Sequence, residues 1–174
     1  MKIGLLSDTH GVIDKESLGF LSDVDEIWHA GDIGTEKVLD TLENIKPVRA
    51  VFGNIDDHKI RTRTKEKLRF KIQEVDVLMI HIGGYPGRYV PLVRREIEEN
   101  PPDLFISGHS HILKVINDPK HKLLHINPGA AGNKGWHKFV TVIKFEINNG
   151  KIENLQIFEK PRKTRNDYGR QIPQ

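Results

Sequence analysis

Residues that can bind metal ions stand close to glycine at five places along the chain. The five segments are Asp8-Thr9-His10-Gly11, Gly31-Asp32, Gly53-Asn54, His81-Ile82-Gly83 and Gly108-His109-Ser110-His111. Each follows a short apolar run typical of a buried strand, and glycine permits the close backbone approach that such turns need. In open α/β sheets, ligands gather outside the carboxyl ends of the strands. We therefore expect seven side chains to meet in one crevice: Asp8, His10, Asp32, Asn54, His81, His109 and His111.

The chemistry of these seven side chains favours two metal ions. Two carboxylates, four imidazoles and one amide oxygen exceed the needs of a single four-coordinate ion, and they suit two divalent ions about 3.5–4 Å apart with one carboxylate bridging. The chain has no cysteine, which excludes disulfides and thiolate ligands. A cationic pair opposes the negative charge that builds on a phosphate ester under attack, and it lowers the pKa of a shared water. The pattern therefore predicts hydrolysis of a phosphate ester.

Apolar runs and turn signals predict an alternating chain in the first half and a strand-rich second half. Strands are expected over 2–7, 26–29 and 48–52, with a helix from a cap at Thr35 through Ile45, so the first half should form a parallel sheet. A second helix should begin at Pro91, and a hairpin turn should lie at Asn148-Asn149-Gly150. The remaining strands are expected over 68–72, 77–82, 103–107, 113–117, 122–126, 139–147 and 151–158, the last four of them antiparallel.

Two local expectations follow for the histidines. His81 should stand on a strand, and His109 and His111, if extended, should face the same side of the backbone. Outside the motifs, His29, His121, His125 and His137 are expected to be structural, like Asp56, which should orient a neighbouring loop. Asp57 and His58 are weaker candidates for a proton donor. Trp28 and Trp136 are expected in the core or at an interface rather than as platforms for substrate.

In order and spacing, these motifs resemble those of the calcineurin-like metallophosphoesterases. The residues that carry the likeness are Ser7-Asp8-Thr9-His10, Gly31-Asp32, Gly53-Asn54-Ile55-Asp56, His81 and Gly108-His109-Ser110-His111. The likeness spans about residues 2–130, and Asn127-Pro128-Gly129 adds similarity to the small single-domain bacterial and archaeal phosphodiesterases of that superfamily. The resemblance implies the metallo-dependent phosphatase fold, an α/β, four-layer αββα sandwich of two mixed sheets.

The resemblance also implies a role for each matching residue. Asp8, His10 and His111 would hold one divalent ion, and Asn54, His81 and His109 the other, with Asp32 bridging. Asp32, Asn54 and His109 would in addition take part in catalysis. Manganese is the first expectation for both ions, with iron, nickel, zinc or magnesium as alternatives.

The chain departs from the family pattern at two places. Many members carry histidine directly after the motif asparagine, where it contacts phosphate, whereas this chain has Ile55. Because isoleucine has no acidic proton to donate, we expect weak protonation of the leaving group, and hence a preference for esters with acidic leaving groups. After His81, Ile82 precedes the usual glycine. The glycine-rich segment that follows contains Arg88, which we expect to contact a substrate phosphate together with Asn54.

The leading functional hypothesis is a binuclear phosphodiesterase that acts through a metal-bridging hydroxide. The alternatives are a phosphomonoesterase or nuclease of the same fold, and a non-catalytic scaffold such as the eukaryotic retromer subunit that resembles this fold. We expect a small phosphate ester as substrate, with nucleic acid only as a substrate and no membrane partner. A homo-oligomer is compatible with the sequence.

Length and charge place the chain in a broad class. Its 174 residues fit one domain, expected over residues 1–160. The net charge of +3 is carried by the C-terminal region, so residues 161–174 are expected to form a loosely ordered basic tail. No apolar stretch approaches the 18 residues of a membrane span, and the apolar N-terminal run is too short for a signal peptide. A cytoplasmic location is therefore expected.

Overall fold

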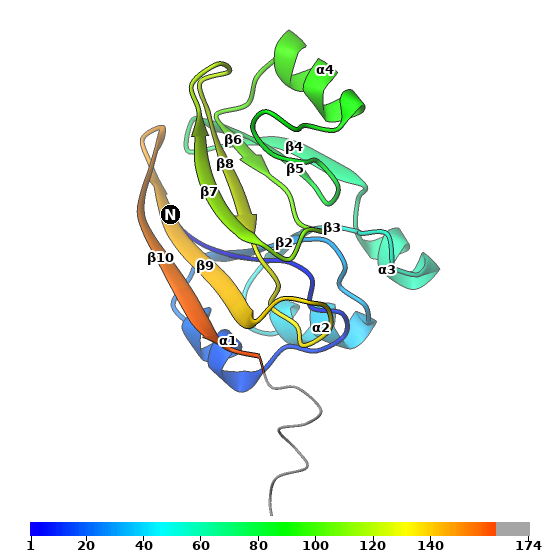
Figure 1. The fold of residues 1–174 in the computed structure, drawn as a ribbon. Helices are drawn as coiled ribbons and strands as arrows, with labels where there is room; N and C mark the ends of the chain where they lie inside the picture. Colours follow the sequence, from blue (N-terminus) through cyan, green and yellow to red (C-terminus); the bar gives the residue numbers. More distant parts are fainter. Residues whose placement is uncertain (163–174) are drawn as a thin grey trace, which may run out of the picture.

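Two mixed five-stranded sheets form the centre of the structure, a computed structural model that describes residues 1–162 (Figure 1). The first sheet has the strand order β10-β9-β1-β2-β3 and the second has the order β4-β5-β6-β8-β7. The strands of the first sheet are β1 (Lys2–Leu6), β2 (Glu26–Ala30), β3 (Val48–Val51), β9 (Phe139–Asn148) and β10 (Lys151–Pro161). Those of the second are β4 (Lys67–Ile72), β5 (Val75–Ile80), β6 (Leu104–Ile106), β7 (Leu113–Asp118) and β8 (Leu123–Pro128).

Both sheets have a parallel centre and antiparallel edges. Strands β1, β2 and β3 pair in parallel, as their helical crossover requires, and β5, β6 and β8 do the same in the second sheet. Strand β9 pairs antiparallel with both β1 and β10, and the pairs β4–β5 and β7–β8 are also antiparallel. The last four strands are therefore not one antiparallel set. The chain crosses from β8 back to the first sheet, where β9 and β10 complete it.

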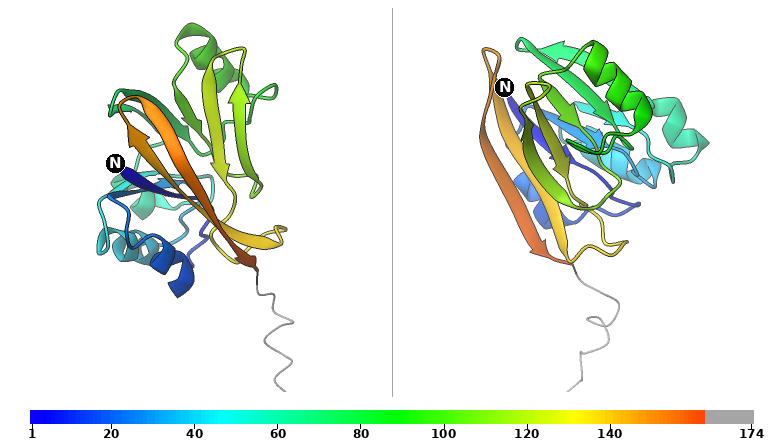
Figure 2. Two further views of the ribbon diagram at one scale, coloured as in Figure 1. Left: turned by 90° about the vertical axis from the view of Figure 1, so that its left-hand side faces the viewer. Right: turned by 45° about the horizontal axis from the view of Figure 1, so that its top comes forward.

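Helices cover the outer face of each sheet and create four layers. Apolar side chains from both sheets fill the space between them, with Trp28, Met79 and Phe145 among the buried ones. On the outer face of the first sheet lie α1 (Lys15–Phe20), α2 (Glu36–Glu43) and α3 (His58–Arg63). Helix α4 (Pro91–Glu99) covers the second sheet on the opposite side, as Figure 2 shows. The expected αββα sandwich is confirmed.

Several local boundaries differ from the expectations. Helices α1 and α3 were not expected, and each begins at an aspartate whose carboxylate accepts backbone N–H groups, Asp14 for α1 and Asp57 for α3. Thr35 does precede α2, but its side chain makes no capping hydrogen bond, and the helix ends at Glu43. The β9–β10 hairpin turns through Asn149 and Gly150 with positive φ at both residues, as the sequence predicted.

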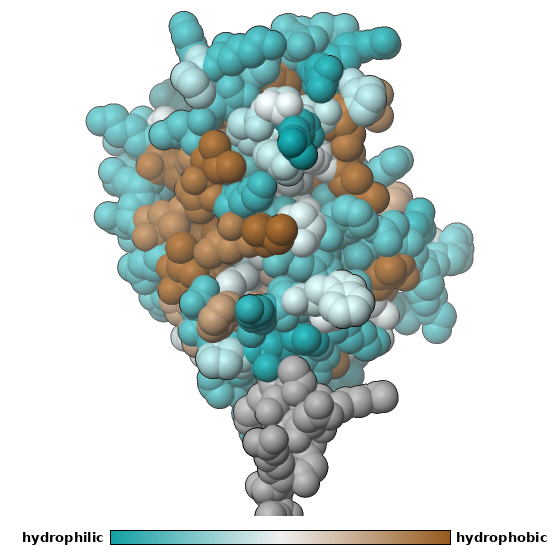
Figure 3. Space-filling model, viewed as in Figure 1, coloured by the Kyte–Doolittle hydropathy of each residue, from teal (hydrophilic) through white to brown (hydrophobic). Residues whose placement is uncertain are grey.

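The molecular surface shows where apolar side chains remain exposed. On the face seen in Figure 3 they gather over β7, β9 and β10, while the ends of the molecule are hydrophilic. Trp28 is buried in the core as expected, whereas the side chain of Trp136 is fully exposed. No helix within residues 1–162 has the length and apolar character needed to cross a bilayer. Strand β10 runs to Pro161, and the expected loose tail lies, beyond Arg162, outside the described residues.

Candidate metal centre

The predicted site residues follow the carboxyl ends of five neighbouring strands. They come after β1, β2 and β3 in the first sheet and after β5 and β6 in the second. Backbone hydrogen bonds join the first two turns: Asp8 N donates to Gly31 O at 2.9 Å and His10 N donates to Asp32 O at 3.0 Å. The structure thus brings the segments together at one end of the sandwich. His81 is the first residue after β5, so its expected place on the strand was wrong by one position.

Five of these residues have a left-handed backbone. The φ angles of Asp8, His10, Asp32, His109 and His111 lie between 47° and 67°. Non-glycine residues seldom adopt this conformation, and they concentrate at functional sites where the surrounding structure enforces it. The expectation that His109 and His111 point the same way along an extended backbone was therefore wrong. Their side chains instead enter two different groups of polar residues.

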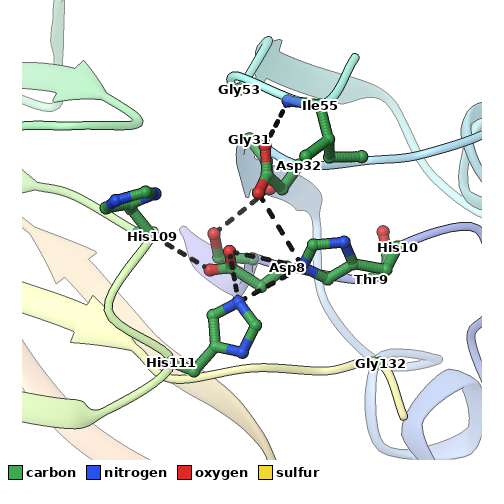
Figure 4. A network of polar contacts seen from close by, with 12 residues as sticks. Asp8, Thr9, His10, Gly31, Asp32, Gly53, Ile55, His109, His111 and Gly132 are labelled. Atoms are coloured by element: carbon green, nitrogen blue, oxygen red, sulfur yellow. Dashed lines mark hydrogen bonds and ion pairs between the residues drawn. The ribbon is translucent and has the colours of Figure 1, made fainter. Parts of the chain in front are cut away.

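The first group consists of Asp8, His10 and His111, whose ligand atoms lie within 4.8 Å of one another. His10 Nε2 and His111 Nε2 are 3.2 Å apart, and His111 Nε2 is 3.1 Å from Asp8 Oδ1. Ligand atoms about 2.1 Å from a shared ion stand roughly 3.0–3.4 Å apart. Figure 4 shows the Asp8 carboxylate beside the rings of His10 and His111. The other carboxylate oxygen of Asp8 accepts the backbone N–H of His109 at 3.1 Å, which fixes its orientation.

The second group consists of Asp32, His81 and His109. Asp32 Oδ1 lies 3.2 Å from His81 Nε2, while Asp32 Oδ2 lies 3.7 Å from His10 Nε2 of the first group. The carboxylate of Asp32 therefore stands between the two groups, with one oxygen directed to each. A carboxylate in this position is suited to bridge two divalent ions.

The turn after β3 carries Asn54 and lies against the second group. Its neighbour Ile55 donates its backbone N–H to Asp32 Oδ1 at 3.1 Å, and Asn54 lines the same hollow as His81. The buried carboxylate of Asp56 accepts the backbone N–H groups of Ile33, Gly34 and Gly53 at 2.7–3.1 Å. Asp56 thus ties this turn to the turn after β2, which is the orienting role that the sequence predicted.

A comparison with known families decides what kind of protein has this geometry. The model of the calcineurin-like phosphoesterase superfamily domain matches residues 1–150. The chain belongs to this superfamily. A probable metallophosphoesterase of Methanothermobacter thermautotrophicus is 33% identical over 137 residues, which cover 75% of this chain and 77% of the relative. A probable metallophosphoesterase of Methanocaldococcus jannaschii is 35% identical over 136 residues, covering 75% and 68% of the two chains.

Solved structures of lower identity share the fold. Zinc-complexed Vps29 of Entamoeba histolytica superimposes with a TM-score of 0.73 at 17% identity, over 94% of this chain and all of the other. A structure described as a novel archaeal phosphodiesterase superimposes with a TM-score of 0.69 at 20% identity, over 91% of this chain and all of the other. The calcineurin-like superfamily is metal-dependent, so the two groups described above are its candidate metal sites.

Electrostatics within the centre fit bound cations. Asp8 and Asp32 are buried, and within residues 1–162 their only ion-pair partners are histidines. Buried charges without a partner are costly, and proteins compensate them with counter-charges or metals. Asp8 Oδ1 and His81 Nε2 are buried atoms with no hydrogen-bond partner in the described part of the chain. Both atoms face into the centre, so the donor set fits metal ions.

The pKa values of His10, His81 and Asp32 reflect two opposing effects, burial and the charges of neighbouring groups. Burial lowers the pKa of His10 despite the nearby carboxylates of Asp32 and Asp8, which keeps a lone pair available on the ring. Burial opposes the charged forms of His81 and Asp32 as well, but their mutual contact outweighs it, raising the pKa of His81 and lowering that of Asp32.

Hydrogen bonds to backbone carbonyls set the tautomers of two candidate ligands. His81 Nδ1 lies 2.8 Å from Ala30 O, which can only accept, so this nitrogen carries the proton and Nε2 faces the centre with its lone pair. His137 Nε2 likewise donates to Gly132 O at 3.0 Å, so its Nδ1 accepts the Nδ1–H of His111 at 3.2 Å. Because His111 Nδ1 carries the proton, the lone pair of His111 lies on Nε2, which faces Asp8 and His10.

His137 is therefore a residue whose role the sequence reasoning underrated. It was expected to be structural, yet its ring contacts a candidate ligand 26 positions away. His29, in contrast, is structural as expected. Its Nε2 lies 2.9 Å from the Thr9 hydroxyl, its Nδ1 accepts the Gly31 N–H, and burial lowers its pKa to about 3. His29 is thus a neutral residue that links the turns after β1 and β2 by hydrogen bonds.

The expected contact between Arg88 and a substrate phosphate stays a prediction. Arg88 is exposed in a turn closed by a hydrogen bond from its N–H to Tyr85 O. The arginine that lines the hollow beside Asn54 and His81 is Arg61. The sequence did not indicate that Arg61 would lie there, because helix α3, which carries it, was not expected.

Proposed function

We propose that this superfamily member is a phosphodiesterase that uses two divalent ions, with manganese the first expectation. The observation that carries the proposal is the position of the Asp32 carboxylate, which directs one oxygen to each of two candidate ligand groups. A single-ion site would not need a carboxylate shared in this way. Bound ions would supply positive charge to the phosphate and an activated water as nucleophile.

The residues of the chain position these ions and the substrate. Asp8 is oriented by the His109 N–H, and Asp32 by the Ile55 N–H, so both carboxylates are fixed before substrate binds. Preorganised charges of this kind lower the barrier without reorganising during the reaction. Of the seven predicted ligands, Asn54 and His109 are exposed, which makes these two residues accessible to a phosphate.

Removing the shared carboxylate tests the proposal. Asp32→Ala should reduce bound metal from two ions per chain toward one or none, and should lower turnover of bis(p-nitrophenyl) phosphate by at least about 10³-fold. Metal analysis after dialysis and phenolate release measure the two effects. The matched control is Asp118→Asn, which alters a buried carboxylate bound to Tyr89 and His121 outside the centre. Full turnover by Asp32→Ala would refute the proposal.

The side chain at position 55 predicts a dependence on the leaving group. Ile55 is 46% exposed beside the centre, and its side chain has no proton to give. The rate should therefore fall steeply as the leaving-group pKa rises in a series of aryl esters. Ile55→His should restore about 10–100-fold for poor leaving groups and change little for p-nitrophenolate. A flat series in the unaltered protein would contradict this part of the proposal.

Two other functions are separated by the same measurements. A phosphomonoesterase would turn over p-nitrophenyl phosphate faster than the diester under matched metal loading. A scaffold would bind metal yet turn over no ester. The similarity to Vps29 shows a shared fold at 17% identity, whereas all seven predicted ligand positions here hold residues that can bind metal, which favours the enzyme.

A further inference from the structure

A hollow of about 290 Å³ opens beside the candidate metal centre. Asn54 and His81 form the wall that it shares with the centre. Most of the remaining wall is apolar and comes from the end of β3, the end of β5 and the start of α4. These apolar residues are Phe52, Ile80, Ile82, Val90, Leu92 and Val93. The volume is near the lower end of the range for sites that bind small organic molecules.

Arg61 stands in the hollow as a fixed cation. Its Nε donates to Asp56 O at 2.7 Å and its Nη2 donates to Gly53 O at 3.2 Å, while the guanidinium lies 4.4 Å from the centre of the Phe52 ring. Its helix neighbours Lys59 and Arg63 pair with acidic residues of α2. Arg61 has no carboxylate within 4.0 Å in residues 1–162. Two of its five N–H groups donate hydrogen bonds within residues 1–162, which leaves three for a ligand.

This combination of walls selects one kind of ligand. An apolar surface favours a hydrocarbon or ring over a hydrated group, and the flat guanidinium over Phe52 extends the aromatic surface while offering donors at its edge. Glu66, which also lines the hollow, adds a hydrogen-bond acceptor. A flat ring with polar atoms at its edge can contact the apolar wall, the Arg61 donors and the Glu66 acceptor. A short alkyl group can use neither the donors nor the acceptor.

We propose that this hollow binds an aromatic organic group of the phosphate ester while the phosphate lies at the metal centre. The inference rests on the proposed function, because the phosphate must be held at the centre for its organic group to reach the hollow. It adds the substrate class: esters that carry a ring, such as aryl or nucleoside esters, over small alkyl esters. Arg61 and Leu92 are then specificity-determining residues.

Two phosphonates that cannot be hydrolysed as esters measure the preference directly. Phenylphosphonate and methylphosphonate present the same anionic group to the metals and differ only in the organic group. Calorimetric titration of manganese-loaded protein should give a dissociation constant at least about tenfold lower for phenylphosphonate, from the apolar area that the ring buries.

A charged side chain in the hollow should abolish this preference. Leu92 is 69% exposed in the first turn of α4, where an acidic residue is favourable for the helix, so Leu92→Glu should fold normally. The ratio of the two dissociation constants should fall to near one. The matched control is Ile112→Glu, which places the same charge at a 57%-exposed position next to His111, outside this hollow. Its ratio should equal that of the unaltered protein.

The outcomes separate this inference from the proposed function. Equal affinity for both phosphonates, or an unchanged ratio in Leu92→Glu, overturns the inference even where diesters are hydrolysed. A ratio that falls only in Ile112→Glu assigns the ring to the neighbouring hollow lined by Trp136 and also overturns it. If neither phosphonate binds and no ester is turned over, the proposed function itself fails and the inference fails with it.

Discussion

The ring of His137 sets the tautomer of the candidate metal ligand His111. Because His137 Nε2 donates to Gly132 O, its Nδ1 accepts from His111 and leaves His111 Nε2 unprotonated. Partners of this kind orient ligand rings and typically contribute 10–100-fold to metal affinity. The segment that carries His137 lies between β8 and β9, so the first ligand group depends on a loop that contributes no ligand to it.

His137→Ala should weaken metal binding at the first group by about 10–100-fold. Calorimetric titration with manganese should show weaker binding at one of two sites and unchanged binding at the other. His137→Gln keeps an acceptor and a donor and should recover part of the affinity. The control is His121→Ala, which removes a hydrogen-bond partner of Asp118 that lines a different hollow and belongs to neither ligand group. Equal affinity in His137→Ala and the unaltered protein would refute the assignment.

His125 predicts how stability depends on pH. Burial lowers its pKa to about 4, although its Nδ1 contacts Phe105 O at 3.2 Å. Between the unfolded value of about 6.5 and the folded value of about 4, the unfolded chain binds a proton that the folded chain does not. The free energy of unfolding should therefore fall as the pH is lowered through this interval, by roughly 3 kcal/mol in total.

The variant that isolates this effect is His125→Phe. It preserves the stacked contact with Phe105, whose ring centre lies 5.2 Å from that of His125, and removes the titrating group. Urea unfolding of metal-free protein at pH 7 and pH 5 should show a smaller loss in the variant than in the unaltered chain. The same loss in both would show that His125 does not carry the pH dependence.

At the scale of elements, glycine lets the strand ends approach one another. A Cβ atom on Gly53 would collide with Asp32 Oδ1 and with the Asp32 backbone nitrogen. The turn after β3 can lie against the bridging carboxylate only because this side chain is absent. The position of the turn, and hence of Asn54, is therefore linked to the position of Asp32.

Gly53→Ala should displace the Asp32 carboxylate and lower metal affinity by at least about tenfold, while far-ultraviolet circular dichroism stays unchanged. The matched control is Gly19→Ala in α1, where an added Cβ meets no atom within 4 Å. That variant should bind metal normally and gain up to about 1 kcal/mol in stability from higher helix propensity. Normal metal binding by Gly53→Ala would show that the turn adapts.

The sequence predicted the strand ends but not their backbone geometry. Apolar runs bounded by glycine located β1, β2, β3 and β6, and the polar residues after them do converge. The left-handed conformation of His109 and His111 was not predictable, because contacts with the turns after β1 and β5 impose it. The four C-terminal strands were found, but periodicity carries no information on which sheet each joins.

Helices and long-range partners were the other limit of prediction. Helices α1 and α3 have six residues each, too few for an apolar period to emerge, and only Asp14 and Asp57 mark their starts. His137 and Arg61 acquire their roles from contacts between distant segments, which no local pattern encodes. The domain boundary near residue 160 and the metal-ligand roles of the seven residues stay predictions.

At the scale of the whole molecule, each candidate ion would join the two sheets. In the first group Asp8 and His10 follow β1 of the first sheet, while His111 follows β6 of the second. In the second group Asp32 follows β2, and His81 and His109 follow strands of the second sheet. Ions bound to these two groups would therefore bridge the two layers, and metal binding should be linked to the stability of the entire sandwich.

Removing metal should accordingly lower the unfolding temperature of the whole chain. An ion present at about 1,000 times its dissociation constant adds about 4 kcal/mol to the free energy of unfolding. For a chain of this length that corresponds to a fall of roughly 8–16 °C per ion on chelation. Calorimetry with and without a chelator should show one cooperative transition that shifts as a unit, because ions in these two groups would contact residues of both sheets. Asp32→Ala should already unfold near the chelated temperature and respond little to chelator. A chelator that strips two ions, verified by metal analysis, without moving the transition would show that the ions lie at a site that does not join the sheets.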